Sequence, residues 1–179
     1  MGDFNTVLKR KINTLGRIIC NPGAYIFQEL QAVHDRQVLK DCRSTYAVHR
    51  SVLFGTGTKL YGDGQISVGE GSYMGRYCLV NAVEGHKVTI GTNCAMSDFI
   101  AIYTQNRKAD QDFSKTCEFE YGNVTIGDYC WIGFGVFIKQ GVSIGKNCVI
   151  GAHSVVVKDI PDYSIAVGAP ARVVKTISH

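Results

Sequence analysis

VTIGDYCWIGFGVFIKQGVSIGKNCVIGAHSVVV, residues 124–157, is the stretch that decides the fold of this chain. Aliphatic residues recur in it at every sixth position, namely Ile126, Ile132, Ile138, Ile144, Ile150 and Val156. A helix repeats about every 3.6 residues and a strand about every two, so neither produces a strict period of six. A six-residue repeat is typical of a parallel β-helix, in which each coil buries its apolar side against the coils above and below.

The residue after each aliphatic position shows that the full period is eighteen. Gly127 and Gly133 are followed by Lys139, and two further glycines, at 145 and 151, are followed by Val157. Two glycines and one other residue therefore alternate in a fixed order, which indicates three short strands in each triangular coil. The repeat also covers residues 68–103, and residues 46–64 are expected to form a degenerate first coil. We therefore expect a mainly β protein built as a parallel β-helix.

Length, composition and charge limit the class of protein. With 179 residues, 45% of them hydrophobic, the chain has the size of one domain, or of one domain with a small attachment. No apolar run approaches the roughly 18 residues of a membrane span, and no signal peptide opens the sequence. The net charge of +4 is mild and the basic residues are scattered, so nucleic acid is not an expected partner. A soluble globular protein is expected.

The cysteines follow the repeat. There are seven, and none forms a Cys-x-x-Cys pair. Four of them lie four residues after an aliphatic position, namely Cys78, Cys94, Cys130 and Cys148. That position faces the interior of a coil, where a small apolar thiol packs well. We therefore expect core cysteines rather than a metal site or disulfides, and a reducing, cytoplasmic compartment.

Residues 1–45 differ from the rest and are predicted to be helical. The first part carries an apolar stripe at helical spacing, with basic neighbours: Leu8, Ile12, Leu15 and Ile19. The run NPG at residues 21–23 breaks the helix, and a second stretch, about residues 24–39, carries Ile26, Leu30 and Val33 on one side. Two interpretations stay open. The helices pack on the β-helix, or the basic one makes peripheral contact with the inner face of a membrane, near lipid-linked substrates.

Two insertions interrupt the repeat, each after the third hexad of its coil. The first covers residues 84–87 and includes His86, and the second covers residues 105–123. Because adjacent coils lie about 5 Å apart, both insertions should leave the same corner of the prism, one above the other. Loops on a rigid scaffold often carry function, so this corner is the expected active site. The predicted organisation is a helical region (1–45), a β-helix domain (46–170) and a C-terminal tail (171–179).

At this point the sequence resembles a known family, the hexapeptide-repeat O-acetyltransferases, which include maltose, galactoside, and capsular or lipopolysaccharide acetyltransferases. The similarity covers about residues 64–176, and the ending KDIP…AVGAPARVVK is specific to members that use acyl-CoA. The resemblance implies a left-handed β-helix, a homotrimer, and acetyl-CoA bound in the groove between neighbouring subunits. It also implies acetyl transfer to a sugar hydroxyl, in bacterial surface polysaccharide synthesis.

The resemblance further assigns coenzyme-binding residues. Trp131 matches the tryptophan beside the reactive end of the pantetheine arm, and Gly133 and Ala152 match positions whose backbone lines that arm. Backbone groups at such positions hydrogen-bond the amides of pantetheine.

Three basic residues complete the assigned set. Lys158, in the KDIP run, matches a lysine near the phosphates of coenzyme A, and Arg172 and Lys175 match basic residues at the nucleotide end. Cations at these places offset the phosphate charge. The implied cofactor is acetyl-CoA as acetyl donor, with no metal ion.

The residue at the family's catalytic position departs from the pattern. Family members read roughly Ile-Tyr-Thr-x-x-His at the start of the long loop, and the histidine is the general base that takes the proton from the acceptor hydroxyl. Here residues 102–107 read IYTQNR, which places Arg107 at that position. Arginine stays protonated and has no acceptor lone pair, so it cannot act as a base.

Three interpretations of Arg107 stay open. The base lies elsewhere, or the chain is an inactive relative that still binds coenzyme A, or Arg107 is an altered residue in an otherwise active enzyme. Among the five histidines, His86 is the best replacement base because it lies on the neighbouring insertion at the same corner. His153 lies near the coenzyme groove and is expected to face away from the acceptor.

Two other function classes compete with the transferase interpretation. A zinc enzyme of the γ-carbonic-anhydrase type needs three histidines converging on one metal, and this sequence has no closely spaced histidine pair. A coenzyme-free structural or interaction module would not need the KDIP and PARVVK runs.

Overall fold

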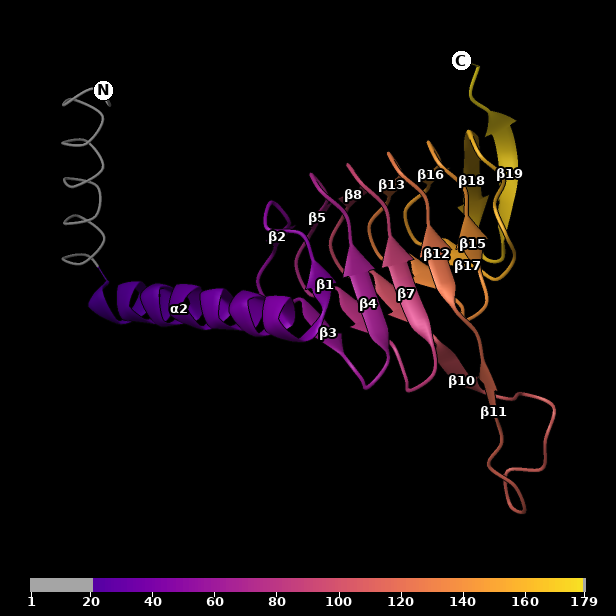
Figure 1. Ribbon diagram of the computed structural model, residues 1–179, viewed down its shortest axis with the longest axis horizontal. Coiled ribbons are helices and arrows are strands. Elements are labelled where there is room, and N and C mark those ends of the chain that lie inside the picture. The colour runs from indigo at the N-terminus through magenta and orange to yellow at the C-terminus, as the bar shows by residue number, and fades with distance from the viewer. Residues whose placement is uncertain (1–20, 179) are drawn as a thin grey trace. The chain divides into compact units, whose positions relative to one another are not determined.

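The computed structural model describes residues 21–178, and the chain divides into two compact units, residues 1–37 and residues 38–179. The second unit is a parallel β-helix of stacked triangular coils, which confirms the predicted fold class (Figure 1). The β-helix is left-handed, as expected. Residues 46–64 form its first coil, as expected. The predicted helix with the stripe at residues 8–19 lies outside the described residues.

Helix α2 (Pro22–Thr45) confirms the second predicted helix and is longer than expected. Asn21 caps its start, because the Asn21 side-chain oxygen accepts a hydrogen bond from the backbone N–H of Ala24 at 3.0 Å. Pro22 takes the first helical position, where its missing N–H would have no partner in the helix. The predicted packing of the N-terminal helices on the coils stays a prediction.

The end of α2 belongs to the second unit and is fixed to the first coil. Cys42 is buried in the core, and the Arg43 guanidinium donates hydrogen bonds to the carbonyl oxygens of Arg50 (2.6 Å) and Val52 (3.1 Å). The two carbonyl groups belong to the segment between the first two strands, in the first coil. The register of the first coil is therefore held from its N-terminal side.

Each coil contributes one strand to each of three parallel sheets, and the strands stack directly above one another. The first sheet contains β1 (Ala47–Val48), β4 (Gln65–Val68), β7 (Lys87–Ile90), β12 (Val124–Ile126) and β15 (Ser143–Ile144). The second contains β2 (Leu53–Phe54), β5 (Tyr73–Met74), β8 (Ala95–Met96), β13 (Trp131–Ile132), β16 (Val149–Ile150), β18 (Ser164–Gly168) and β19 (Ala171–Thr176). The third contains β3 (Lys59–Tyr61), β6 (Leu79–Asn81), β9 (Ala101–Tyr103), β14 (Phe137–Ile138) and β17 (Val155–Val156).

The core is the column of aliphatic residues that defined the repeat. All six of them are at most 1% exposed: Ile126, Ile132, Ile138, Ile144, Ile150 and Val156. The four periodic cysteines are buried as predicted, and burial raises the pKa of the Cys78 thiol. A buried thiol of raised pKa is an inert packing group, since the thiolate is the reactive form.

Close stacking of the coils explains the glycines. A Cβ atom on Gly127 would lie 2.6 Å from the backbone nitrogen of Lys146, and one on Gly133 would lie 2.7 Å from that of Ala152. Both distances are shorter than real Cβ contacts, so only glycine fits. After the third strand of a coil the corresponding position is taken by a larger residue, such as Lys139 after β14.

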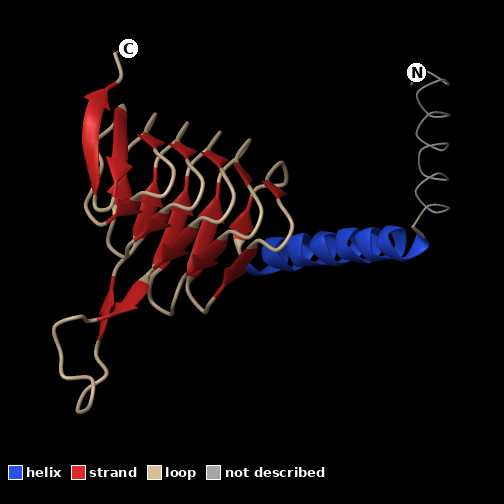
Figure 2. Ribbon diagram, turned by 180° about the vertical axis from the view of Figure 1, so that it is seen from behind, coloured by secondary structure: helices blue, strands red, loops and turns tan. Residues whose placement is uncertain are grey.

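Two antiparallel pairs depart from the coil pattern. Strands β10 (Gln105–Arg107) and β11 (Phe119–Tyr121) form a two-stranded ribbon whose loop extends away from the coils (Figure 2). Strand β19 folds back on β18 at the last coil, so the predicted C-terminal tail includes a strand. Within residues 21–178, no helix is both long and apolar enough to cross a membrane.

Candidate active site

The turns that join third-sheet strands to first-sheet strands form one corner of the prism, which we call the third corner. The loop with His86 follows β6 there, and the ribbon follows β9 in the next coil. The sequence-based expectation that both insertions leave the same corner is therefore confirmed. A hydrogen bond joins the two insertions to each other, because the side-chain oxygen of Asn123 accepts from the backbone N–H of Lys87 at 2.9 Å.

The ribbon presents two different faces, because side chains alternate along each strand. Gln105 lies opposite Tyr121, and Arg107 lies opposite Phe119, so these four side chains share one face. The His86 ring stacks on Tyr121, with centroids 5.4 Å apart and planes inclined by 24°. This face of the ribbon, which we call the His86 face, is directed toward the first insertion.

The opposite face of the ribbon is anchored by polar side chains to the turn after β14. The Asn106 amide donates to the side-chain oxygen of Gln140 at 2.6 Å, and Gln140, only 7% exposed, donates to Glu120 at 2.9 Å. Lys139 pairs with the same carboxylate at 3.0 Å. A buried amide with both ends satisfied fixes geometry well, so the ribbon is held firmly on this side.

The orientation of His86 suits a general base. Its Nδ1 lies 3.1 Å from the carbonyl oxygen of Glu84. A carbonyl oxygen only accepts hydrogen bonds, so Nδ1 carries the proton and Nε2 has the free lone pair. Stacking on Tyr121 restricts rotation of the ring in addition. The sequence places His86 at this corner but does not reveal either contact.

A polar cavity of about 330 Å³ lies beside this imidazole. It is lined by Asp63, Gly64, Gln65, Gly85, His86, Lys87 and Asn123. Carboxylate, amide and ammonium groups converge there, and such groups hydrogen-bond the hydroxyls of a small polar acceptor. The cavity therefore offers room for a small polar molecule beside the His86 side chain.

One further ionisable group at this corner is unsuited to act as a base. Tyr61 ends β3, in register with Asn81 and, one coil on, Tyr103. Burial, together with a hydrogen bond and repulsion from Tyr103, raises the pKa of Tyr61 to about 12. The phenol therefore stays protonated at neutral pH and can serve only as a hydrogen-bond donor or neutral acceptor.

Arg107 lies at the end of β10, exposed, on the His86 face. Among the described residues its guanidinium has no hydrogen bond or ion pair, although the next residue, Lys108, pairs with Glu118 at 3.2 Å. The structure thus brings the two sequence-based candidates, His86 and Arg107, to one side of one element.

The coenzyme candidates fall into two groups. Trp131, 56% exposed, points outward from the second sheet, and Gly133 and Ala152 lie at the ends of β13 and β16 of that sheet. Arg172 and Lys175 lie on β19, at the edge of the same sheet.

Lys158 does not join this group within one subunit. It follows β17 and lies at the third corner, with His86 and the ribbon. The residues that the sequence assigns to coenzyme binding thus lie on different sides of a single prism.

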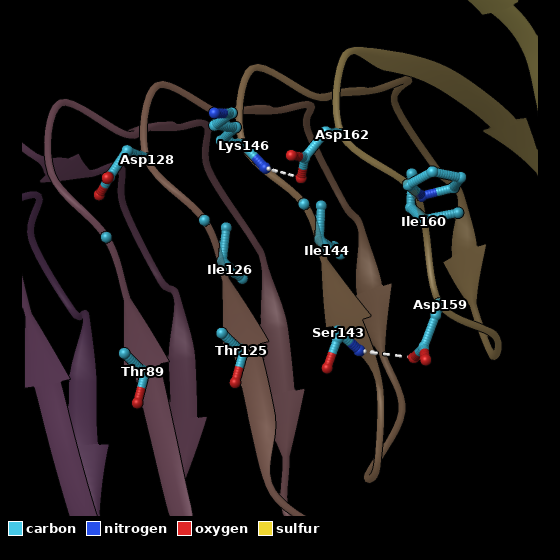
Figure 3. A pocket seen from close by; sticks show the side chains of 14 residues that line it. Thr89, Thr125, Ile126, Asp128, Ser143, Ile144, Lys146, Asp159, Ile160 and Asp162 are labelled. Atoms are coloured by element: carbon cyan, nitrogen blue, oxygen red, sulfur yellow. Dashed lines mark hydrogen bonds between the residues drawn. The ribbon is translucent and has the colours of Figure 1, made fainter.

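A groove of about 660 Å³ lies along the outer side of the first sheet and was not predicted (Figure 3). Thr89, Thr125 and Ser143 form a column of hydroxyl groups along it, and Asp159 accepts a hydrogen bond from the Ser143 N–H at 2.8 Å. The signal was present in the sequence, since each hydroxyl residue directly precedes an aliphatic position of the repeat. Among the described residues, no cluster of side chains could hold a metal ion.

Comparisons with known proteins identify relatives of this chain. Residues 123–158 match the family model described as bacterial transferase hexapeptide (six repeats). A Saccharomyces cerevisiae protein named as an acetyltransferase is 35% identical over 145 residues, which cover 80% of this chain and 69% of that protein. The crystal structure of a maltose O-acetyltransferase from Clostridium difficile 630 is 34% identical, with a TM-score of 0.66 over 76% of this chain and 73% of that one. A galactoside acetyltransferase solved in complex with coenzyme A is 31% identical, with a TM-score of 0.55 over 75% of this chain and 63% of that one.

Proposed function

The chain belongs to the hexapeptide-repeat acetyltransferase family, and from this premise we propose that it transfers the acetyl group of acetyl-CoA to a hydroxyl group of a sugar. The observation that carries the proposal is the oriented imidazole of His86 beside a polar cavity. Relatives that act on maltose and galactoside support a sugar as the acceptor, and the coenzyme A complex supports the donor.

The proposed reaction uses His86 as the general base. Nε2 takes the proton from the acceptor hydroxyl while the oxygen attacks the carbonyl carbon of the thioester. The carbon–sulfur bond then breaks, the acetyl ester forms, and the leaving thiolate takes up the proton from the imidazolium. Arg107 occupies the place of the family histidine, and of the three interpretations above the geometry supports a base that lies elsewhere.

Coenzyme binding is assigned to the second sheet. The exposed Trp131 ring and the backbone at Gly133 and Ala152 offer a flat surface for the pantetheine arm, and Arg172 and Lys175 offset the phosphate charge at its far end. These assignments rest on the match to the family's motif together with the exposure of the residues.

The two separate groups of site residues support a homotrimer. Acetyl-CoA held at Trp131 of one subunit cannot approach His86 of that subunit, because the two lie on different sides of the prism. A neighbouring subunit can bring its own third corner, with His86 and Lys158, to this surface. Closed cyclic symmetry then builds equivalent sites between adjacent subunits.

We also propose that the enzyme works in the cytoplasm, in bacterial surface polysaccharide synthesis. Cys42, Cys78, Cys94, Cys117, Cys130 and Cys148 are all free thiols. Free thiols fit a reducing compartment, which is also where acetyl-CoA is available. Peripheral membrane contact through the N-terminal region remains part of this proposal, and the exposed Ile26, Leu30 and Val33 on α2 are consistent with it.

The test is release of coenzyme A from acetyl-CoA, followed with a thiol reagent, across a panel of mono- and oligosaccharides. Sugar-dependent release with an acetylated product is expected. Binding of acetyl-CoA without release on any sugar would support an impaired relative instead. Absence of binding would support a structural β-helix module, and either result would overturn the proposal.

A further inference from the structure

Most charged side chains of the ribbon and its loop are paired, but among the described residues Arg107, on the His86 face, and Asp110, in the loop, form no ion pair. Lys108 pairs with Glu118, Lys139 with Glu120, and Lys115 with Asp112 at 2.9 Å. The carboxylates nearest to Arg107 along the two strands, at residues 118 and 120, are therefore already engaged by other cations. Both also belong to the opposite face, since they lie across from residues 108 and 106.

Arg107 therefore carries its charge on a surface that offers aromatic rings and no acid. Phe119 lies directly across from it, and Tyr121 follows two residues, or about 7 Å, along the strand, where it stacks on His86. An arginine among aromatic rings, with its five donors unused by the protein, is suited to bind a carboxylate or phosphate in a two-pronged geometry.

A second cation, Lys87, directly follows His86 in the chain. Lys87 lines the acceptor cavity, and like Arg107 it forms no ion pair within residues 21–178. Two exposed cations thus belong to this corner, Lys87 at the start of β7 and Arg107 at the end of β10. Asp63 is the acid and Lys87 the cation among the residues that line the cavity, and Arg107 adds a positive charge on the His86 face of the ribbon.

We propose that Arg107 determines acceptor specificity by binding an anionic group of the sugar, so that the enzyme acetylates acidic rather than neutral sugars. This inference rests on the proposed function and names the substrate class of that site. A carboxylate, as in a uronic acid, and a phosphate, as in a sugar phosphate, share the required chemistry. The arginine that replaces the family's base thereby has a role in binding instead of proton transfer.

The experiment compares three acceptors that differ at one carbon: glucose, glucuronic acid and glucose 6-phosphate, each also offered as its p-nitrophenyl glycoside. The same comparison is made with the galactose series. We expect kcat/KM to be higher for the acidic member of a series, and the preference to weaken as salt is added, because both cations are exposed. Comparing kcat/KM for the uronic acid with kcat/KM for the sugar 6-phosphate shows whether the site binds a carboxylate or a phosphate.

Arg107→Gln removes the charge and keeps a polar side chain of similar reach. We expect it to lower the ratio of acidic to neutral kcat/KM by about 10- to 100-fold, the size of a charge-assisted hydrogen bond. Lys108→Gln is the matched control, because Lys108 is the adjacent cation and belongs to the opposite face. It should leave the ratio unchanged.

The outcomes separate the two proposals. No release of coenzyme A on any sugar of the full panel overturns the proposed function and this inference with it. Release that is as fast on neutral as on acidic sugars overturns the inference alone. A preference for acidic sugars that survives in Arg107→Gln shows that another group binds the anion, and also overturns it.

Discussion

Tyr121 is the residue of the ribbon whose ring stacks on the His86 imidazole. It contributes no proton to the proposed reaction, but its ring lies 5.4 Å from the imidazole and limits the directions in which Nε2 can point. Positioning of a catalytic group within a narrow range of geometry accounts for a large share of enzymatic rate. At the scale of single residues, the account therefore assigns Tyr121 a positioning role and His86 the chemistry.

This assignment predicts different results for two substitutions at one position. Tyr121→Ala should lower kcat by about 10-fold with little change in KM, because the base is misplaced while the binding groups remain. Tyr121→Phe keeps the stacked ring and should retain the wild-type kcat. Equal losses of kcat in both variants, measured by steady-state kinetics, would show that the ring does not act by stacking.

At the scale of elements, each coil is held to the next by aspartate side chains that accept hydrogen bonds from backbone N–H groups. Asp98 is the strongest example. The Arg76 backbone N–H donates to Oδ1 at 2.7 Å, and the Arg76 guanidinium donates to Oδ2 at 3.0 Å and 2.8 Å. These bonds and the ion pair hold the pKa of the Asp98 carboxyl below its ordinary value.

The lowered pKa of Asp98 determines how the stability of the fold changes with pH. The Asp98 carboxylate stabilises the fold above its unfolded-state pKa, and this contribution is lost as the pH falls through the lower folded-state pKa. Asp98→Asn should therefore have a lower Tm at pH 7 and a flatter decline of Tm below about pH 4. Thermal unfolding between neutral and acid pH measures this. Asp110→Asn, an exposed control in the ribbon loop, should follow the wild-type curve; a parallel curve for Asp98→Asn would contradict the account.

The glycines between coils give a second prediction at this scale. Gly133→Ala places a Cβ atom 2.7 Å from the Ala152 backbone nitrogen, so two coils must move apart. We expect unfolding in urea to show a loss of about 1–3 kcal/mol, the usual cost of overpacking. Gly23→Ala, where the nearest atom lies 3.8 Å away, is the control and should not destabilise. Wild-type stability in Gly133→Ala would show that the coils stack less tightly than described.

At the scale of the whole molecule, the proposed active site is shared between subunits, with Trp131 from one and His86 from the next. This predicts complementation between two inactive variants. Homotrimers of Trp131→Ala and homotrimers of His86→Asn should each have impaired activity. When both variants are co-expressed in equal amounts, about one quarter of the sites should be active, because random assembly places an intact Trp131 beside an intact His86 at about that frequency. Activity of the purified mixed trimers measures this. Mixed trimers without recovery would place both residues in one subunit.

The sequence predicts the fold well because the fold repeats. Every coil needs a buried aliphatic residue such as Ile138 at the same place. The aliphatic residues therefore recur at a fixed interval along the sequence. The corner that carries both insertions is predictable for the same reason, since any insertion after a third hexad must leave there. The ribbon is not predictable, because residues 105–123 have no repeat. The opposition of Gln105 and Tyr121, and the stacking of Tyr121 on His86, depend on tertiary contacts.

The hydroxyl groove on the first sheet was missed for a different reason. Its residues do repeat, at Thr125 and Ser143, but a small polar residue on an exposed face is also what any solvated strand carries. The sequence pattern alone does not distinguish a groove from an ordinary surface. Only the stacking of the coils, with Asp159 folded against Ser143, shows that the face is hollowed.

The most direct test of the account is the rate of coenzyme A release by His86→Asn on the acceptor that the wild-type enzyme uses best. The account predicts a fall of about 10²- to 10⁴-fold, the usual contribution of a general base, with the Tm unchanged. His34→Asn, an exposed histidine on α2, should keep the wild-type rate, and Arg107→His should not raise it. A wild-type rate in His86→Asn, together with a gain of similar size in Arg107→His, would contradict the account and return the catalytic role to position 107.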